Sequence, residues 1–193
     1  MRRAILGGTF DPPHIAHLAA GEAAYWQLGV DVVTFMPAGS PWQKRGRLVS
    51  DAHHRLEMTR LAVESVEYFD VDPVEVDREG WTYTADTLDL FPDDEIYLVL
   101  GSDAAANLPT WNRADEVLGR ATVAVMGRPG TDRARIEATL GGGFVWLDTP
   151  AIELSGTELR ERVAAGRSIR FLVPDLVFEY VEANRLYRNG DGR

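Results

Sequence analysis

Apolar runs alternate with amphipathic stretches along most of this chain. Five apolar runs have the length of buried strands; they cover residues 4–6, 30–36, 96–100, 121–126 and, more weakly, 144–147. Segments with helical spacing of apolar positions lie between them, at 15–28, 51–65, 84–90, 113–118 and 132–140. Apolar strands that alternate with crossover helices are typical of a parallel sheet covered on both faces. We therefore expect an α/β fold with a Rossmann-like, doubly wound parallel sheet.

The last part of the chain has a different pattern. After residue 149 the apolar spacing becomes purely helical, at 157–165 and 174–187, and the apolar positions of 172–187 suit core packing or a subunit contact. No internal repeat or linker-like stretch divides the chain. The sequence predicts one domain over 1–193, with a sheet core at 1–149, a helical part at 150–188 and a frayed tail at 189–193. The sequence leaves open whether the chain forms a homo-oligomer.

Composition narrows the function classes. The 193 residues include no cysteine, which excludes disulfides and thiolate chemistry, and no early apolar segment has the length of a signal peptide or membrane span. We therefore expect a cytoplasmic protein without a membrane partner. The formal net charge of -10 argues against nucleic acid as a partner, because phosphate neutralisation needs a basic surface. If this acidic chain binds phosphates, it must concentrate positive charge locally.

The segment 8–17, Gly-Thr-Phe-Asp-Pro-Pro-His-Ile-Ala-His, is the strongest single signal in the chain. It follows the first expected strand, and the pair Gly7-Gly8 lets the backbone approach a ligand closely. Pro12-Pro13 suits the first turn of a helix, which would place His14 and His17 on one face near a positive helix end. Such a layout predicts an anion site. Taken alone, the two histidines could also cap a helix, pack in the core or form half of a zinc site.

Three further expected strands end in candidate binding residues, at 37–44, 101–103 and 127–129. In an open α/β sheet, ligands bind at the carboxyl ends of the strands. The glycine turn matches neither Gly-x-Gly-x-x-Gly nor the P-loop. A second phosphate-type motif is Ser155-Gly-Thr-Glu158, a capping box in which Ser155 is the expected N-cap. With Arg160 one turn further on, this helix start could also cradle a phosphate.

The motifs at 8–17 and 154–160 together resemble the two signatures of the HxGH-type nucleotidyltransferase superfamily, which includes the nicotinate and nicotinamide mononucleotide adenylyltransferases. The stretches 81–87, 100–103, 108–111 and 173–187 resemble its bacterial nicotinate branch and follow in the family's order. The resemblance implies transfer of AMP from ATP to nicotinic acid mononucleotide, giving the dinucleotide and pyrophosphate for NAD biosynthesis, with Mg²⁺ carried by ATP. It also implies direct in-line attack on the α-phosphorus of ATP, without a covalent enzyme intermediate.

The resemblance assigns site residues by position. For ATP it implies Gly7, Gly8, Thr9, Phe10, His14, His17, Ser155, Thr157 and Arg160. For the mononucleotide it implies Lys44, Trp81, Tyr83, Thr84, Asp103 and Trp111, and for catalysis His14, His17, Lys44 and Arg160. Relatives usually have a second serine where this chain has Gly156, so the contact of that side chain does not carry over.

Several alternatives stay open on the sequence alone. The aromatic residues could be core packing, Asp103 could cap a helix, and His53-His54 and the acidic run 67–79 are most simply solvated surface. The acceptor could instead be nicotinamide mononucleotide, phosphopantetheine, or a phosphorylated alcohol paired with CTP. A non-catalytic nucleotide-binding protein, or an interaction domain of the same fold, is the remaining class.

Overall fold

The structure is a computed structural model that describes residues 1–39, 49–127 and 130–188. Within these residues the strands are β1 (Arg2–Gly8), β2 (Val32–Pro37), β3 (Phe69–Val71), β4 (Glu95–Gly101), β5 (Ala121–Met126) and β6 (Phe144–Leu147). They form one parallel sheet in the order β3-β2-β1-β4-β5-β6. The order reverses between β1 and β4, and the Rossmann-like doubly wound fold is confirmed.

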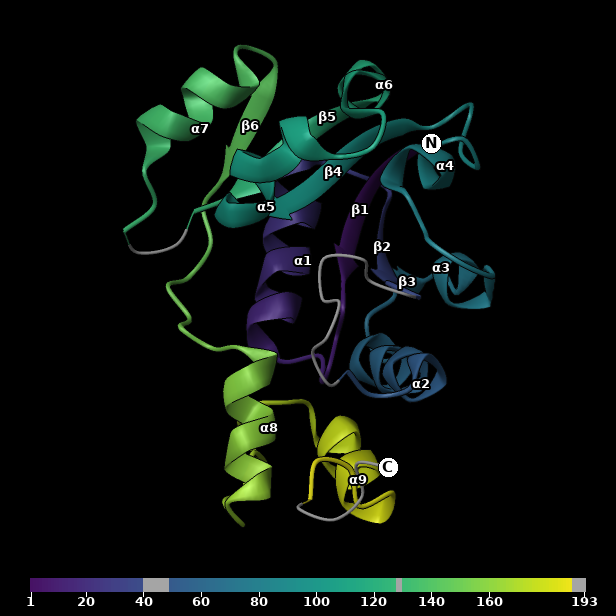
Figure 1. Cartoon of the computed structure of the whole chain (residues 1–193), viewed down its shortest axis with the longest axis vertical. Helices are drawn as coiled ribbons and strands as arrows, with labels where there is room; N and C mark the ends of the chain where they lie inside the picture. The colour runs from purple at the N-terminus through teal and green to yellow at the C-terminus, as the bar shows by residue number, and fades with distance from the viewer. Residues whose placement is uncertain (40–48, 128–129, 189–193) are drawn as a thin grey trace.

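Helices cover both faces of the sheet (Figure 1). The chain order gives α1 (Ile15–Leu28), α2 (Ala52–Val63), α3 (Val74–Asp77), α4 (Thr84–Leu88), α5 (Ser102–Asn107), the 3-10 turn η2 (Leu108–Thr110), α6 (Ala114–Arg120), α7 (Arg133–Leu140), α8 (Gly156–Ala164) and α9 (Asp175–Ala183). One buried cluster joins the sheet to α1, α2, α8 and α9, and a second joins it to α4, α5, α6 and α7.

The alternation of side chains along each strand explains the two cores. On β1, Leu6 belongs to the cluster with α1 whereas its neighbour Ile5 belongs to the cluster with α4. On β5, Ala124 and Val125 divide in the same way. Successive strand residues point to opposite faces, so a strand that is covered on both sides must be apolar throughout. This is the physical cause of the continuous apolar runs in the sequence.

The acidic run 67–79 is not simply solvated surface, and that interpretation was wrong. Residues 69–71 form β3, which pairs with β2 and completes the edge of the sheet. The strand has three residues with Asp70 in the middle, so it carries neither the length nor the apolar continuity that identified the other strands. Of the two histidines at 53 and 54, His53 is exposed, whereas His54 is half-buried and its Nδ1 lies 2.8 Å from the Tyr180 hydroxyl.

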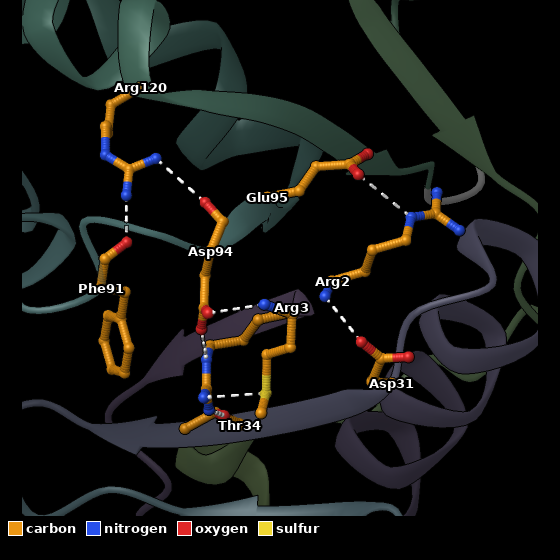
Figure 2. A network of polar contacts seen from close by, with 9 residues as sticks. Arg2, Arg3, Asp31, Thr34, Phe91, Asp94, Glu95 and Arg120 are labelled. Atoms are coloured by element: carbon orange, nitrogen blue, oxygen red, sulfur yellow. Dashed lines mark hydrogen bonds and ion pairs between the residues drawn. The ribbon is translucent and has the colours of Figure 1, made fainter.

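A polar network joins residues near the amino ends of the central strands (Figure 2). The sequence motifs follow the carboxyl ends of the strands. Arg3 Nε donates to Asp94 Oδ2 at 2.7 Å, and its Nη1 donates to Thr34 Oγ1 at 2.7 Å. The backbone N–H of Arg2 donates to Asp31 Oδ2, and Arg120 donates to the backbone carbonyls of Asp94 and Phe91. These contacts tie β1 to β2 and β4. Residues at this end contribute to stability and leave the carboxyl ends for the site.

Candidate active site

The chain leaves β1 at Gly8, and six residues separate the strand from α1, which begins at Ile15. Phe10, with a positive φ of 50°, is 1% exposed and packs its ring against His17 and Phe35. The helix begins at Ile15, with His14 in extended backbone conformation as its N-cap. Pro12-Pro13 therefore precede the helix, and the expectation that they form its first turn was wrong. The reason is that the first helical turn opens one residue after His14, which shifts both prolines outside it.

His14 and His17 lie against each other at the start of α1. Their ring centroids are 3.7 Å apart and the planes are inclined by 23°, so the rings are stacked. The backbone N–H of His14 donates to Nδ1 of His17 at 3.2 Å. In a neutral His17 ring this contact leaves the proton on Nε2, which makes Nε2 a hydrogen-bond donor. His14 is buried and His17 is half-buried.

The beginning of α8 meets this turn. Ser155 Oγ accepts from the backbone N–H of Glu158 at 3.2 Å, which confirms Ser155 as the N-cap. Arg160 Nη1 donates to the backbone carbonyl of Asp11 at 2.8 Å and lies 3.6 Å from Asp11 Oδ2, while Nη2 donates to Thr157 Oγ1. Arg160, which belongs to the second motif, thus binds Asp11 of the first motif directly.

Gly156 lies close to the backbone of the first motif. A Cβ at this position would lie 2.7 Å from the carbonyl oxygen of Asp11, a separation that real Cβ atoms essentially never show. The backbone of Asp11 fills the space that a side chain at position 156 would need.

A cavity of about 280 Å³ lies between these elements. It brings together seven residues that the sequence assigned to ATP: Thr9, Phe10, His14, His17, Ser155, Thr157 and Arg160. Its remaining wall includes strand ends of β4 and β5 at Gly101, Met126 and Gly127. The cavity therefore combines hydroxyl, imidazole and guanidinium groups with the carboxyl ends of the central strands, which is the chemistry of a phosphate site.

A second cavity of about 190 Å³ opens on the other side of Thr9, which lines both. The sequence-assigned residues along it are Gly7, Gly8, Thr9, Tyr83, Thr84 and Trp111. The structure thus places Gly7 and Gly8 along this second cavity and Phe10 along the first. Aromatic and apolar groups dominate the wall, together with the hydroxyls of Thr82 and Thr84. Such a wall suits a flat ring with a few polar contacts.

Two assigned residues of the described part of the chain do not line either cavity. Trp81 is 43% exposed and Asp103 is exposed in the first turn of α5, and neither belongs to the lining of the two cavities. Gly101, not Asp103, is the N-cap of α5. Lys44 lies outside the described residues. The roles of these three residues stay predictions.

The second cavity also contains a carboxyl group that sequence reasoning missed. Glu75 lines it, and its Oε1 accepts from Thr87 Oγ1 at 2.9 Å. Burial raises the pKa of Glu75, against the hydrogen bonds from Thr87 and Thr82 that favour the charged form. Asn112, next to Trp111, is a further missed lining residue. A glutamate within an acidic run gives no signal that it faces inward.

Asp11 is the buried acceptor of this region, and it lies within the first motif. Its side chain is 2% exposed, and it accepts from the Tyr187 hydroxyl at 2.8 Å and from the backbone N–H of Ser50 at 3.1 Å. Because Asp11 lies within the first motif, the sequence could have indicated it as a site residue. Tyr187 lies at the end of the last matching stretch, so the sequence offered a weaker signal there.

Residues 1–39, 49–127 and 130–188 hold neither a metal-binding cluster nor a helix suited to a membrane. No group of three or more His, Asp or Glu side chains is arranged there to hold a metal ion. No helix of that part of the chain combines the length and apolar character that crossing a membrane requires.

Comparison with known proteins agrees with this geometry. The family model described as Cytidylyltransferase-like matches residues 5–162. Two relatives, both named "Probable nicotinate-nucleotide adenylyltransferase", come from Thermoanaerobacter sp. (strain X514), with 38% identity over 99% of this chain and 96% of the relative, and from Roseiflexus sp. (strain RS-1), with 41% identity over 95% and 96%.

Solved structures agree at the level of the fold. Plasmodium falciparum nicotinic acid mononucleotide adenylyltransferase complexed with APC superimposes with a TM-score of 0.77, at 16% identity, over 96% of both chains. The same enzyme complexed with NaAD gives a TM-score of 0.77 at 15% identity. At this identity the likeness shows the fold. The sequence identity to the bacterial relatives extends over nearly the whole length and shows the family: this chain belongs to the nicotinate-nucleotide adenylyltransferase family of cytidylyltransferase-like enzymes.

Proposed function

We propose that the chain transfers AMP from ATP to the 5'-phosphate of nicotinic acid mononucleotide, forming nicotinic acid adenine dinucleotide and pyrophosphate. The observation that carries this proposal is the pair of cavities that meet at Thr9. The first cavity offers hydrogen-bond donors for phosphate groups, and the second offers aromatic side chains. Two nucleotides could therefore lie with their reacting phosphates where the cavities meet. The relatives named for the nicotinate reaction support the choice of acceptor.

The reaction needs little covalent chemistry from the protein. An oxygen of the mononucleotide phosphate attacks the α-phosphorus of ATP, and the bond from that phosphorus to the oxygen bridging to the β-phosphorus breaks. Pyrophosphate leaves with the electron pair of that bond. The attacking phosphate is already ionised, so no general base is required. The protein must hold two anions together and stabilise charge on the phosphoryl oxygens.

His14, His17 and Arg160 are the groups we assign to that charge. His17 would donate through Nε2, and Arg160 would present its guanidinium while Asp11 and Thr157 hold it in place. Ser155 and Thr157 would add hydroxyls at the start of α8, and Lys44 would bind phosphate oxygens by resemblance. Arg160 and Lys44 would supply positive charge at the site, which an acidic chain needs locally in order to bind a polyphosphate.

The second cavity is assigned to the pyridine mononucleotide. Trp111 and Tyr83 offer ring faces to a flat, cationic pyridine ring, and Thr84 offers a hydroxyl and a backbone N–H. Trp81 and Asp103 are kept as further mononucleotide contacts on the resemblance alone. No basic side chain lines this cavity within the described residues, so neutral donors would have to bind the nicotinate carboxylate.

Mg²⁺ is expected to enter with ATP, and it would offset the charge of the phosphates. The described residues contain no cluster of carboxylates or histidines that would form a cage for it. The phosphates and water would therefore supply most of its ligands. We derive no step of the reaction through the ion.

Pyrophosphate release from ATP tests the function directly. Nicotinic acid mononucleotide, nicotinamide mononucleotide and phosphopantetheine are offered in turn, followed by a phosphorylated alcohol with CTP. Fastest release with nicotinic acid mononucleotide, with the dinucleotide identified by mass, is the expected result. Faster release with another acceptor would reassign the substrate. No release with any acceptor, despite measurable ATP binding, would favour a non-catalytic nucleotide-binding protein.

A further inference from the structure

One arginine of α2 is directed into the protein interior. Arg55 is 1% exposed, although the same helix carries the exposed Arg60 five residues later. The helix lies beside the carboxyl ends of β1 and β2, next to the turn that leaves β1 (Figure 1). A fully buried guanidinium is costly unless its donors are satisfied, so its partners should show why it is there.

The Arg55 guanidinium donates to four backbone carbonyl oxygens. Nη1 donates to Thr9 at 2.9 Å and to Ala38 at 2.6 Å, Nη2 donates to Gly39 at 2.8 Å, and Nε donates to Ser50 at 3.0 Å. These carbonyls belong to three segments: the turn after β1, the end of β2 and the residue before the N-cap of α2. One planar fork therefore fixes three chain segments relative to one another.

The charge of Arg55 is balanced by nearby carboxylates. Burial lowers the pKa of Arg55, and the attraction of Asp11 and Asp51 opposes that effect. Asp11 also accepts from the N–H of Ser50, whose carbonyl accepts from Arg55. The Ser50 residue is thus held from both sides, by a buried anion at its N–H and a buried cation at its carbonyl.

The position of these contacts gives Arg55 a relation to the two cavities. Thr9 lines both cavities, and Ala38 lines the second one. Nη1 therefore joins the carbonyl of Thr9, in the wall that the two cavities share, to the carbonyl of Ala38 in the wall of the second cavity, and it adds to the direct bond from the Ala38 N–H to the Gly8 carbonyl at 2.8 Å. The first cavity has its own support, because Arg160 is held by Asp11 and Thr157. Loss of the fork should disturb the second cavity more than the first.

We propose that Arg55 is a positioning residue for the transfer reaction, which holds Thr9 and Ala38 together so that the mononucleotide cavity stays aligned with the ATP cavity. This inference rests on the proposed assignment of the two cavities. Arg55 lines neither cavity and acts through the backbone of the cavity wall. Its role is therefore a matter of geometry, and a lysine cannot replace it because one ammonium cannot span carbonyls in three segments.

The test compares Arg55→Lys and Arg55→Gln with Arg60→Met, a change at an exposed arginine of the same helix. Each variant is assayed at a temperature at which its circular dichroism matches that of wild type. KM for each nucleotide and kcat are measured, and binding of each nucleotide alone is measured by calorimetry. If Arg55→Lys does not fold, Arg55→Gln, which removes the buried charge and keeps an amide donor, carries the comparison.

The expected result is selective. In the Arg55 variants, KM and Kd for nicotinic acid mononucleotide rise about tenfold or more, while those for ATP change less than about threefold. Arg60→Met keeps wild-type values. Unchanged constants for both nucleotides in a folded Arg55 variant, with only thermal stability reduced, would overturn the proposal, and so would an equal rise for both. A wild-type chain that binds both nucleotides but releases no pyrophosphate would count against the proposed function, while the binding comparison would still decide the role of Arg55.

Discussion

The hydroxyl of Tyr187 donates to Oδ1 of Asp11 at 2.8 Å, and this contact joins the end of the chain to the first motif. Burial, followed by the charge of Asp11, raises the pKa of Tyr187, so the phenol stays protonated and remains a donor throughout the ordinary pH range. Asp11 in turn contacts Ser50 and Arg160. The C-terminal helical part is therefore coupled to the candidate site by a buried, charge-assisted hydrogen bond.

Replacing Tyr187 by phenylalanine should expose the importance of that bond. The change leaves a buried carboxylate with one donor fewer, and we expect a loss of about 2 kcal/mol in the free energy of unfolding. Urea unfolding at pH 7 measures it. Tyr180→Phe is the matched control, because the Tyr180 hydroxyl meets the half-buried His54. Equal effects of the two substitutions would contradict the special weight of the Asp11 contact.

Asp94 gives a prediction for pH. The hydrogen bond from Arg3, assisted by the amino terminus, lowers the pKa of Asp94 in the folded protein despite the opposing effect of burial. A carboxyl group whose pKa is lower in the folded state stabilises the fold above its unfolded pKa, and that contribution disappears as pH falls through the folded pKa. Asp94→Asn should therefore cost about 1 kcal/mol at pH 7 and progressively less below about pH 4.

Urea unfolding of wild type and Asp94→Asn at pH 7 and pH 3 checks this expectation. Asp93→Asn serves as the control, because Asp93 is the exposed neighbour. A cost for Asp94→Asn that is the same at both pH values would show that the ion pair with Arg3 does not set the stability difference.

Most of the fold could be predicted because its main signals are local. Burial of both sheet faces forces long apolar runs, and five of the strands follow from them. Strand β3 could not be found in this way, since it is a three-residue edge strand whose central residue is Asp70. The helix α5 was missed for a similar reason. It begins directly after β4, and its six residues are too few to show a helical spacing of apolar positions.

The site residues also divide into those with a local sequence signal and those without one. His14, His17, Ser155 and Arg160 stand in compact motifs, and the structure brings them to one cavity. Arg55 and Glu75 stand in no motif, and their importance depends on burial, which is set by tertiary packing. A signal did exist for Arg55, because it shares the apolar face of α2 with Met58 and Thr59. An arginine at a core position predicts a buried polar network, although it does not say which carbonyls it will bind.

Gly156 yields a prediction that runs against the family pattern. Serine at this position would restore the usual side chain of the motif, yet its Cβ would meet the Asp11 carbonyl at 2.7 Å. That neighbour is backbone within the linked motifs, so it cannot move aside cheaply. We expect Gly156→Ser to lower the free energy of unfolding by about 1–3 kcal/mol and to reduce turnover.

Thermal unfolding and pyrophosphate release measure the effect of Gly156→Ser. Gly119→Ser is the control, because Gly119 lies in α6 with open space where a Cβ would be. A Gly156→Ser variant as stable as wild type and more active would mean that the two motifs tolerate a wider separation than this structure shows.

His17 gives the most direct test of the chemistry. Its Nδ1 accepts from the backbone of His14, so the neutral ring presents Nε2 as a donor to developing charge on a phosphoryl oxygen. Loss of one such donor costs roughly 3–4 kcal/mol in other enzymes, and kcat of His17→Ala should fall about a hundredfold or more. KM for ATP should change much less, because the interaction strengthens in the transition state. Steady-state kinetics with His53→Ala as an exposed control measures both constants. A His17→Ala variant that keeps most of its kcat would remove His17 from the catalytic assignment, and the charge would then have to be stabilised by Arg160 and the start of α8.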